Sequence, residues 1–292
     1  MQGLARYIVL AAIALVVTGV SAAPAAAQEP DLVADAPVQL SLGDSWPAGA
    51  RASDPSEGYV PQLNEALKEQ YNCSGVGPQQ AQAGCKHLQL VNLAVGGATT
   101  PTLIANQLPP AEELLESRND DGKPRNDVEV VTLHIGGNDV TNPIINACLI
   151  NRALDCPGTI EAELTAYAND LDQALTRLRA AAGQEARIVI GTYDNPIGSC
   201  FLAQLFPGEA VPLADLVLEG GSLVLSGESL VVEQGLHDIM RDVGGDHGVE
   251  VANVYGDLAP QDWFGGTDCL HPVDSGYDKV TDAFLEVLLA PR

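Results

Sequence analysis

Basic residues are scarce in this chain. Its 292 residues include 14 Lys and Arg against 39 Asp and Glu, which gives a formal net charge of −25 at pH 7. Such a surface repels nucleic acid and anionic bilayers, so we expect neither as a partner. The acidic residues are spread along the chain and form no block, so the charge is also explained by a need for solubility alone. The composition therefore favours a neutral substrate, or one that is bound without electrostatic steering.

Long apolar runs are missing from all but the start of the chain. Residues 8–20 form an apolar run that follows Arg6 and precedes three alanines ending at Ala27. This order of charged, apolar and small residues predicts a secretory signal peptide over residues 1–27. The run is shorter than a typical membrane-spanning helix. The chain has no cysteine near the cleavage point, so a lipid anchor is not indicated. We expect a secreted, extracellular and soluble protein without a stable membrane anchor, whose net charge is −26 once Arg6 is removed.

Metal-binding cysteine patterns are also missing, since the chain has no C-x-x-C and no cluster of histidines. Six cysteines in an exported chain instead predict three disulfides. Fifteen pairings are possible, and the spacing favours two local pairs and one distant pair: Cys73–Cys85, Cys148–Cys156 and Cys200–Cys269. In the chain-entropy model the distant pair stabilises by roughly 4 kcal/mol and each local pair by about 3 kcal/mol.

Apolar strand patterns alternate with amphipathic helical patterns along the chain. We expect strands at residues 38–43, 87–94, 128–135, 186–193 and 249–254. We expect helices at residues 59–71, 102–115, 159–182, 213–243 and 275–289, with Pro109 and Pro110 breaking or restarting the second. Residues 193–212 are expected to form an irregular loop. This alternation predicts an α/β fold whose parallel sheet of about five strands is covered on both faces. After a flexible lead-in at residues 28–37, residues 38–292 are expected to form a single domain.

Unusual polar residues and glycines follow the predicted strands. In the stretch LSLGDSW, an apolar strand meets a break at Gly43 and presents Ser45 in a turn. Later strands end near Gly97 and Asn138, and the loop after the last strand holds residues 268–271. The carboxyl ends of parallel strands lie along one edge, where ligands bind in open α/β sheets. Each short motif alone is also typical of an ordinary polar turn.

These residues match the needs of acyl transfer, namely a nucleophile, a base, a group that orients the base, and donors for the oxyanion. Ser45 is the candidate nucleophile, His271 the base, and Asp268 the acid that orients it. The backbone N–H groups of Ser45 and Gly97 and the side-chain amide of Asn138 are the candidate oxyanion donors. A disulfide between Cys200 and Cys269 would pin the loop that carries the base.

Four stretches together resemble a known family: GDSW (43–46), NLAVGGATT (92–100), GGND (136–139) and DCLHPVDSGY (268–277). The chain is similar to the SGNH, or GDSL-type, hydrolases, and most similar to secreted actinobacterial-type lipases and esterases. The resemblance implies a flavodoxin-like, three-layer α/β/α fold and covers residues 38 to about 285. It assigns Ser45, Gly97, Asn138 and His271 to the four residues that name the family. Some of those enzymes orient the histidine through a backbone carbonyl, and Asp268 favours a full triad here.

Trp46 departs from the family, which often has Leu or Tyr at this position, and it could narrow the space beside the nucleophile. The predicted reaction is two-step hydrolysis of a carboxylic ester through an acyl-enzyme, by an esterase or lipase with no metal and no organic cofactor. We expect a monomer that acts on a small-molecule or lipid ester. Candidate substrate contacts, which could equally be ordinary packing residues, are Trp46, Phe201, Leu202, Leu205, Phe206, Trp263 and Phe264.

Several alternatives remain open at this point. Polysaccharide or glycan O-acetyl ester hydrolysis, thioester cleavage and phospholipid hydrolysis would use the same catalytic residues. A conventional α/β-hydrolase would need a G-x-S-x-G elbow, and no serine of the chain has that context. A non-catalytic exported binding protein would keep the same fold and disulfides. Labelling of Ser45 by a fluorophosphonate would separate an enzyme from a binding protein.

Overall fold

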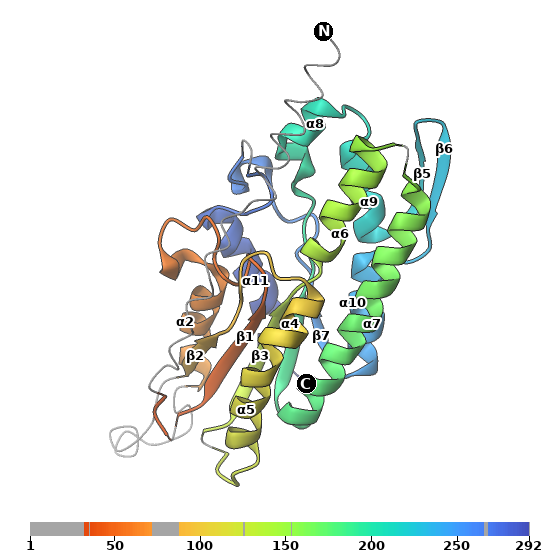
Figure 1. The fold of residues 1–292 in the computed structure, drawn as a ribbon. Coiled ribbons are helices and arrows are strands. Elements are labelled where there is room, and N and C mark those ends of the chain that lie inside the picture. The colour runs from red at the N-terminus through yellow and green to blue at the C-terminus, as the bar shows by residue number, and fades with distance from the viewer. Residues whose placement is uncertain are drawn as a thin grey trace.

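The computed structural model describes residues 32–34, 36–71, 88–124, 126–152, 154–265 and 268–291 (Figure 1). The predicted signal peptide, half of the predicted lead-in and the predicted pair Cys73–Cys85 lie outside these residues. Two other predicted disulfides, Cys148–Cys156 and Cys200–Cys269, are present and confirm those pairings.

A five-stranded sheet with the order β2-β1-β3-β4-β7 forms the centre of the molecule. Every pair of neighbouring strands is parallel. The strands are β1 (Val38–Gly43), β2 (Gln89–Asn92), β3 (Val128–His134), β4 (Arg187–Gly191) and β7 (Glu250–Ala252). All residues of β1 and β4 are buried, as expected for strands that are covered on both faces. The predicted parallel α/β sheet is confirmed.

Helices cover both faces of this sheet and complete the three predicted layers (Figure 1). On one face α2 (Tyr59–Tyr71) packs against α11 (Asp274–Leu289), and the rings of Tyr59 and Phe284 stack with centroids 5.1 Å apart. On the other face α7 (Cys156–Ala182) contacts its neighbours over its length. These neighbours are α4 (Thr100–Asn106), α5 (Leu108–Asn119), α6 (Gly137–Ile144) and α10 (Leu236–Asp246).

Short elements fill the connections on the side where the strands end. They are the 3₁₀ turns η1 (Pro55–Glu57), η3 (Pro196–Ser199) and η4 (Pro260–Asp262), the π-helical η2 (Ile145–Ile150), and the helices α8 (Phe201–Leu205) and α9 (Ala210–Glu219). The segment 193–212, predicted as an irregular loop, therefore contains helical turns. The break predicted at Pro109 and Pro110 is confirmed, because α4 ends at Asn106 and α5 begins at Leu108.

The single helix predicted over residues 213–243 is wrong. An antiparallel hairpin, β5 (Gly221–Leu225) and β6 (Glu228–Val232), separates α9 from α10. Ser226 and Gly227 have φ values of 53° and 90°, the left-handed pair that a two-residue hairpin turn requires. Leu223 lies opposite Leu230, which is buried, so these two leucines share one face of the hairpin.

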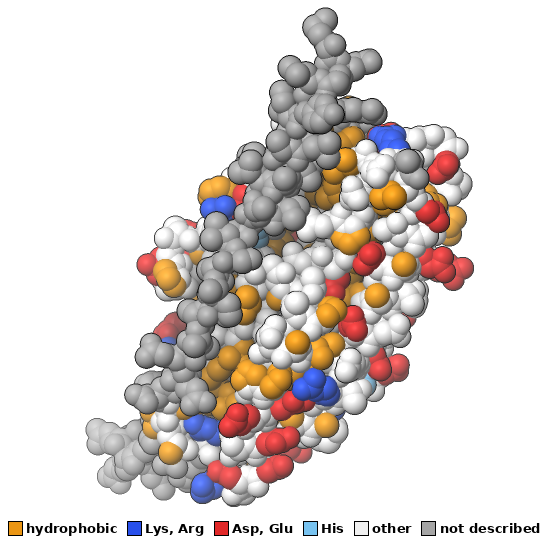
Figure 2. All heavy atoms as spheres, viewed as in Figure 1, with side chains coloured by type: hydrophobic (Ala, Val, Ile, Leu, Met, Phe, Trp, Pro, Cys, Tyr) orange, Lys and Arg blue, Asp and Glu red, His pale blue; other side chains and the backbone are white. Residues whose placement is uncertain are grey.

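Acidic side chains lie at many separate positions on the face drawn in Figure 2, and basic ones are few, as the composition requires. Within the described ranges, each helix is either too short or too polar to cross a bilayer.

Candidate active site

Gly43 ends β1 and sets the direction in which the chain leaves the sheet. Its φ is +138°, and a Cβ at this position would lie 2.0 Å from the carbonyl oxygen of His134 on β3. The side-chain amide of Gln107 accepts from the Gly43 N–H at 2.9 Å and donates to its carbonyl oxygen at 2.8 Å. Only glycine fits this close approach. Ser45 follows two residues later, at the carboxyl edge of the sheet where the motif predicted it.

The serine and histidine predicted from opposite ends of the chain are hydrogen-bonded. Ser45 Oγ lies 2.9 Å from His271 Nε2, and His271 Nδ1 lies 2.5 Å from Asp268 Oδ1. In the tautomer that this geometry favours, Nδ1–H donates to the carboxylate and Nε2 accepts from the serine hydroxyl. The three side chains form a line that is able to move the serine proton to the imidazole.

The second oxygen of Asp268 forms an ion pair with Nε of Arg51, a residue that the sequence did not single out. Burial alone would raise the pKa of Asp268. The hydrogen bonds and charges of His271 and Arg51 outweigh that effect and lower the pKa to about 2. Asp268 is therefore ionised at neutral pH, as the orienting acid must be.

The histidine loop, residues 268–272, is held by partners from distant parts of the chain. Cys269 is joined to Cys200 by the disulfide. The carbonyl oxygen of Leu270 accepts from the indole Nε1–H of Trp46 at 2.9 Å. The imidazole is thus fixed through the backbone on which it stands as well as through its own ring nitrogens.

The predicted oxyanion residues lie on the loops that follow β2 and β3. Gly97 has a φ of +79°, and a Cβ at Gly96 would lie 3.9 Å from the Cβ of Ser45, so this turn passes beside the serine. Asn138 lies in the first turn of α6, and its Nδ2 donates to the carbonyl oxygen of Ala98 at 3.0 Å. That amide has a second N–H, so the pair of loops is able to offer both backbone and side-chain donors.

Neighbouring contacts fix the position of Asn138. Gly136 has a φ of +120°, and a Cβ there would lie 2.5 Å from the ring of Tyr167 on α7. Asp139 accepts from the backbone N–H of Thr100 with both oxygens, at 3.0 and 3.1 Å. Burial is the main reason that the pKa of Asp139 is raised to about 6. These contacts join the starts of α4 and α6 on the two sides of the candidate oxyanion site.

Asp44, which precedes the serine, is buried, and no role for it was predicted from the sequence. Its Oδ2 accepts from the hydroxyl of Tyr193 at 2.5 Å and its Oδ1 from the backbone N–H of Trp46 at 3.0 Å. Burial raises the pKa of Asp44 to about 6, although both hydrogen bonds act in the opposite direction. The turn that carries Ser45 therefore rests on a buried carboxyl group.

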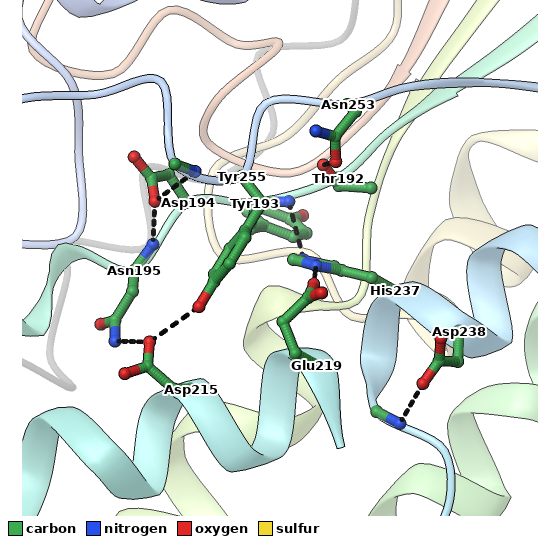
Figure 3. Close-up of polar contacts among 12 residues, drawn as sticks. Thr192, Tyr193, Asp194, Asn195, Asp215, Glu219, His237, Asp238, Asn253 and Tyr255 are labelled. Atoms are coloured by element: carbon green, nitrogen blue, oxygen red, sulfur yellow. Dashed lines mark hydrogen bonds and ion pairs between the residues drawn. The ribbon is translucent and has the colours of Figure 1, made fainter. Parts of the chain in front are cut away.

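A second polar network holds the loops that follow β4 and β7 (Figure 3). Nε2 of buried His237 accepts from the backbone N–H of Tyr193 at 3.1 Å, while Nδ1 faces Glu219 in the short contact drawn in the figure. Burial lowers the pKa of His237, so a neutral ring suits its acceptor role. The carboxylate of Asp194 accepts from the backbone of the β7 loop, including the Leu258 N–H at 2.8 Å. This network supports Tyr193 beneath the serine turn.

The predicted substrate contacts fall into two groups. Trp46 and Trp263 are only 4% and 6% exposed, and their rings pack with centroids 5.7 Å apart beside the histidine loop. On α8, Leu202 is buried and Leu205 is exposed. Phe264 is 51% exposed, and its backbone N–H donates to the carbonyl oxygen of His271 at 3.0 Å. Phe201 and Phe206 are half-buried.

A family model described as the GDSL-like lipase/acylhydrolase family matches residues 41–279. The chain belongs to this family. As a GDSL-like hydrolase it is a carboxylic ester hydrolase, which agrees with the predicted activity. The resemblance seen in the four short motifs is confirmed over most of the chain.

Solved structures share the fold of this GDSL-like hydrolase. The lipase Lip_vut3 from a goat rumen metagenome is 15% identical, with a TM-score of 0.55 over 85% of this chain and 96% of that one. Axe2, an acetylxylan esterase from Geobacillus stearothermophilus, is 15% identical, with a TM-score of 0.51 over 87% and 94% of the two chains. A putative GDSL-like lipase from Parabacteroides merdae is 15% identical, with a TM-score of 0.50 over 86% and 94%. No curated protein matched the chain.

Proposed function

We propose that this chain is a secreted esterase or lipase that cleaves carboxylic esters through a Ser45–His271–Asp268 triad and an acyl-enzyme intermediate. The observation that carries the proposal is the hydrogen-bonded line from Ser45 Oγ through the imidazole to Asp268 Oδ1, with distances of 2.9 and 2.5 Å. A serine hydroxyl is a weak nucleophile without a base within this reach.

In the first step the imidazole of His271 takes the proton of Ser45 as Oγ attacks the carbonyl carbon of the ester. The backbone N–H groups of Ser45 and Gly97 and the amide of Asn138 donate to the oxyanion that forms. Asp268 stabilises the imidazolium. The imidazolium then gives its proton to the departing alcohol oxygen, the carbon–oxygen bond breaks, and an acyl-serine remains.

In the second step water takes the place of the alcohol. His271 removes a proton from the water as its oxygen attacks the acyl carbon, and the same donors hold the second oxyanion. Ser45 Oγ leaves and regains the proton from the imidazolium. The carboxylic acid is released, and every catalytic group used in the two steps belongs to the chain itself.

The substrate class that we propose is a neutral ester. The excess of acidic residues disfavours anionic substrates, and Leu205 and Phe264 offer exposed apolar side chains for an acyl group. Lipid esters, acetylated glycans and phospholipids are distinguished by a substrate panel. It combines p-nitrophenyl esters of increasing acyl length with acetylated xylan and a phosphatidylcholine vesicle.

We also propose that residues 1–27 are removed on export and that the mature protein acts outside the cell as a monomer. The charged, apolar and small-residue order of the leader supports export, as do the two disulfides, which are typical of oxidising compartments. The test is the N-terminal sequence and native mass of protein collected from culture medium. A chain that still begins at Met1 would contradict cleavage.

The test of the triad is labelling by a fluorophosphonate together with hydrolysis of p-nitrophenyl esters. Wild-type protein should react once per chain, and Ser45→Ala should neither react nor turn over. His271→Ala should lose about 10⁴-fold or more in kcat. Ser117→Ala, which removes an exposed serine on α5, is the matched control and should behave as wild type. A Ser45→Ala protein with wild-type turnover would overturn the proposal.

A further inference from the structure

Arg51 has a backbone conformation that arginine rarely adopts. Its φ is +70°, and among the described residues Ser226 is the other non-glycine residue with a positive φ. Such a conformation costs a non-glycine residue free energy that glycine would avoid. Residues of this kind gather at functional sites, where the side chain does something that glycine is unable to do. The contacts of the Arg51 side chain should therefore explain why arginine stands at a position where glycine would cost less free energy.

The side chain of Arg51 lies between the candidate triad acid and an aromatic ring. Nε pairs with Asp268 Oδ2, and the guanidinium carbon lies 4.8 Å from the centroid of the Phe264 ring. The other oxygen of Asp268 faces His271 Nδ1 at 2.5 Å. A planar guanidinium held against a ring fixes the plane of the carboxylate that it binds. Rotation of Asp268 away from the imidazole would break both contacts.

The backbone on either side of Arg51 is tied to the site. Ala50 N–H donates to the carbonyl oxygen of Ser45 at 2.9 Å, and Tyr277 Oη donates to the carbonyl oxygen of Ala50 at 2.6 Å. Ser53 binds both oxygens of Asp274, at 2.8 and 2.6 Å. The turn that begins with the nucleophile thus continues to the residue that contacts the acid.

We propose that Arg51 is a positioning residue, which holds the carboxylate of Asp268 in the orientation that the imidazole of His271 requires. This inference rests on the proposed triad. It is supported by the charge of the acid, because the hydrogen bonds and charges of His271 and Arg51 outweigh burial and keep the pKa of Asp268 at about 2. Arg51 acts through Asp268 and takes no proton itself.

The decisive variant is Arg51→Gly. Glycine adopts a φ of +70° without strain, so this variant should fold at least as well as the wild type. We expect kcat per titrated active site to fall about tenfold, as for loss of a charge-assisted hydrogen bond, with little change in KM. Arg177→Gln removes a comparable ion pair, with Glu112, between α7 and α5, and should leave kcat unchanged.

Chemical rescue separates positioning from a structural role. Millimolar methylguanidinium should restore turnover of Arg51→Gly in a saturable manner, whereas sodium chloride or methylammonium at equal ionic strength should not. Rescue should weaken in the Arg51→Gly and Phe264→Leu double variant, because the ring that supports the guanidinium is lost. A wild-type kcat in Arg51→Gly, or a reduced kcat that methylguanidinium leaves unchanged, would overturn the proposal.

Failure of the role proposed for Arg51 can be told apart from failure of the proposed triad. Turnover that survives in Ser45→Ala would remove the triad and the role of Arg51 with it. An inactive Ser45→Ala protein beside a fully active Arg51→Gly protein would leave the triad intact and remove only the role assigned to Arg51.

Discussion

The indole Nε1–H of Trp46 donates to the carbonyl oxygen of Leu270 at 2.9 Å, so the residue after the candidate nucleophile is bonded to the residue before the candidate base. Leucine, which often follows the serine in GDSL-type enzymes, has no such donor. The ring of Trp46 also packs edge-on against His134 and Tyr193, with centroids 5.0 and 5.1 Å away. Trp46 therefore serves as a link between two loops as well as a core side chain.

Replacing Trp46 with Phe should slow the enzyme more than it changes substrate binding. The ring remains aromatic but the hydrogen bond to Leu270 is lost, and a small shift of the base costs roughly 10- to 100-fold in rate. The measurement is kcat and KM per titrated active site, with urea unfolding alongside. Tyr59→Phe is the control, because within the described part of the chain its buried hydroxyl has no hydrogen-bond partner. A Trp46→Phe protein with wild-type kcat would refute the link.

Replacing Asp268 with Asn should reduce kcat by roughly 10³- to 10⁴-fold, since the amide favours the wrong imidazole tautomer and does not stabilise the imidazolium. The measurement is kcat/KM for a p-nitrophenyl ester as a function of pH. Asp278→Asn, an exposed change on α11, is the matched control. A loss below tenfold would show that the histidine is oriented mainly through the backbone contacts of its loop.

Replacing Asn138 with Ala should lower kcat by about 10²- to 10³-fold, equivalent to about 3 to 4 kcal/mol for a lost oxyanion donor, with KM little changed. Asn142→Ala changes an exposed residue on the same helix and controls for damage to α6. Fluorophosphonate labelling of the variant checks that the serine and histidine remain in place. Equal activity in the two variants would exclude Asn138 from the oxyanion site.

Asp44 should make the free energy of unfolding fall as pH rises, which is the opposite of the usual effect of a carboxyl group. Its pKa is about 6 in the folded protein, because burial raises it from 3.8. Between those two values the folded state binds a proton that the unfolded state has lost, so the free energy of unfolding falls as pH rises. Above both values the change is complete, and it amounts to roughly 1 to 3 kcal/mol.

Asp44→Asn removes this titration, so its stability relative to the wild type should rise between about pH 4 and about pH 7. Urea unfolding at the two pH values measures the difference. Asp278→Asn should show no comparable change with pH, because Asp278 is exposed. A constant difference between Asp44→Asn and wild type at both pH values would mean that folding does not raise the pKa of Asp44.

The parallel sheet and the meeting of the four motifs could be predicted from the sequence, because both depend on local patterns. The strands β1, β3 and β4 are rich in Val, Leu and Ile, a composition that favours strands buried on two faces. Parallel strands then bring their carboxyl ends to one edge, whatever lies between them in the chain. The hairpin of β5 and β6 was missed although Gly220-Gly221 and Ser226-Gly227 are dipeptides that mark turns, because each of its strands is only five residues long and the pair lies between two helices.

The residues that surround the candidate triad could not be predicted, because their partners are distant in sequence. Arg51 meets Asp268 across 217 residues, and Gln107 meets Gly43 across 64. Neither contact leaves a pattern of spacing in its own neighbourhood. Gln107 lies between two helices and Arg51 lies in a loop, where polar residues are ordinary. Only the folded positions of α5 and of the histidine loop give these side chains their partners.

The candidate nucleophile and base lie 226 residues apart in the chain yet share a hydrogen bond. A ribosome that has synthesised the protein as far as β7 has already made every strand of the central sheet, but not His271. In the proposed mechanism His271 is the base, so hydrolysis requires the segment that is synthesised after β7 and leads into α11. On this mechanism we expect no turnover from a nascent chain that ends before His271.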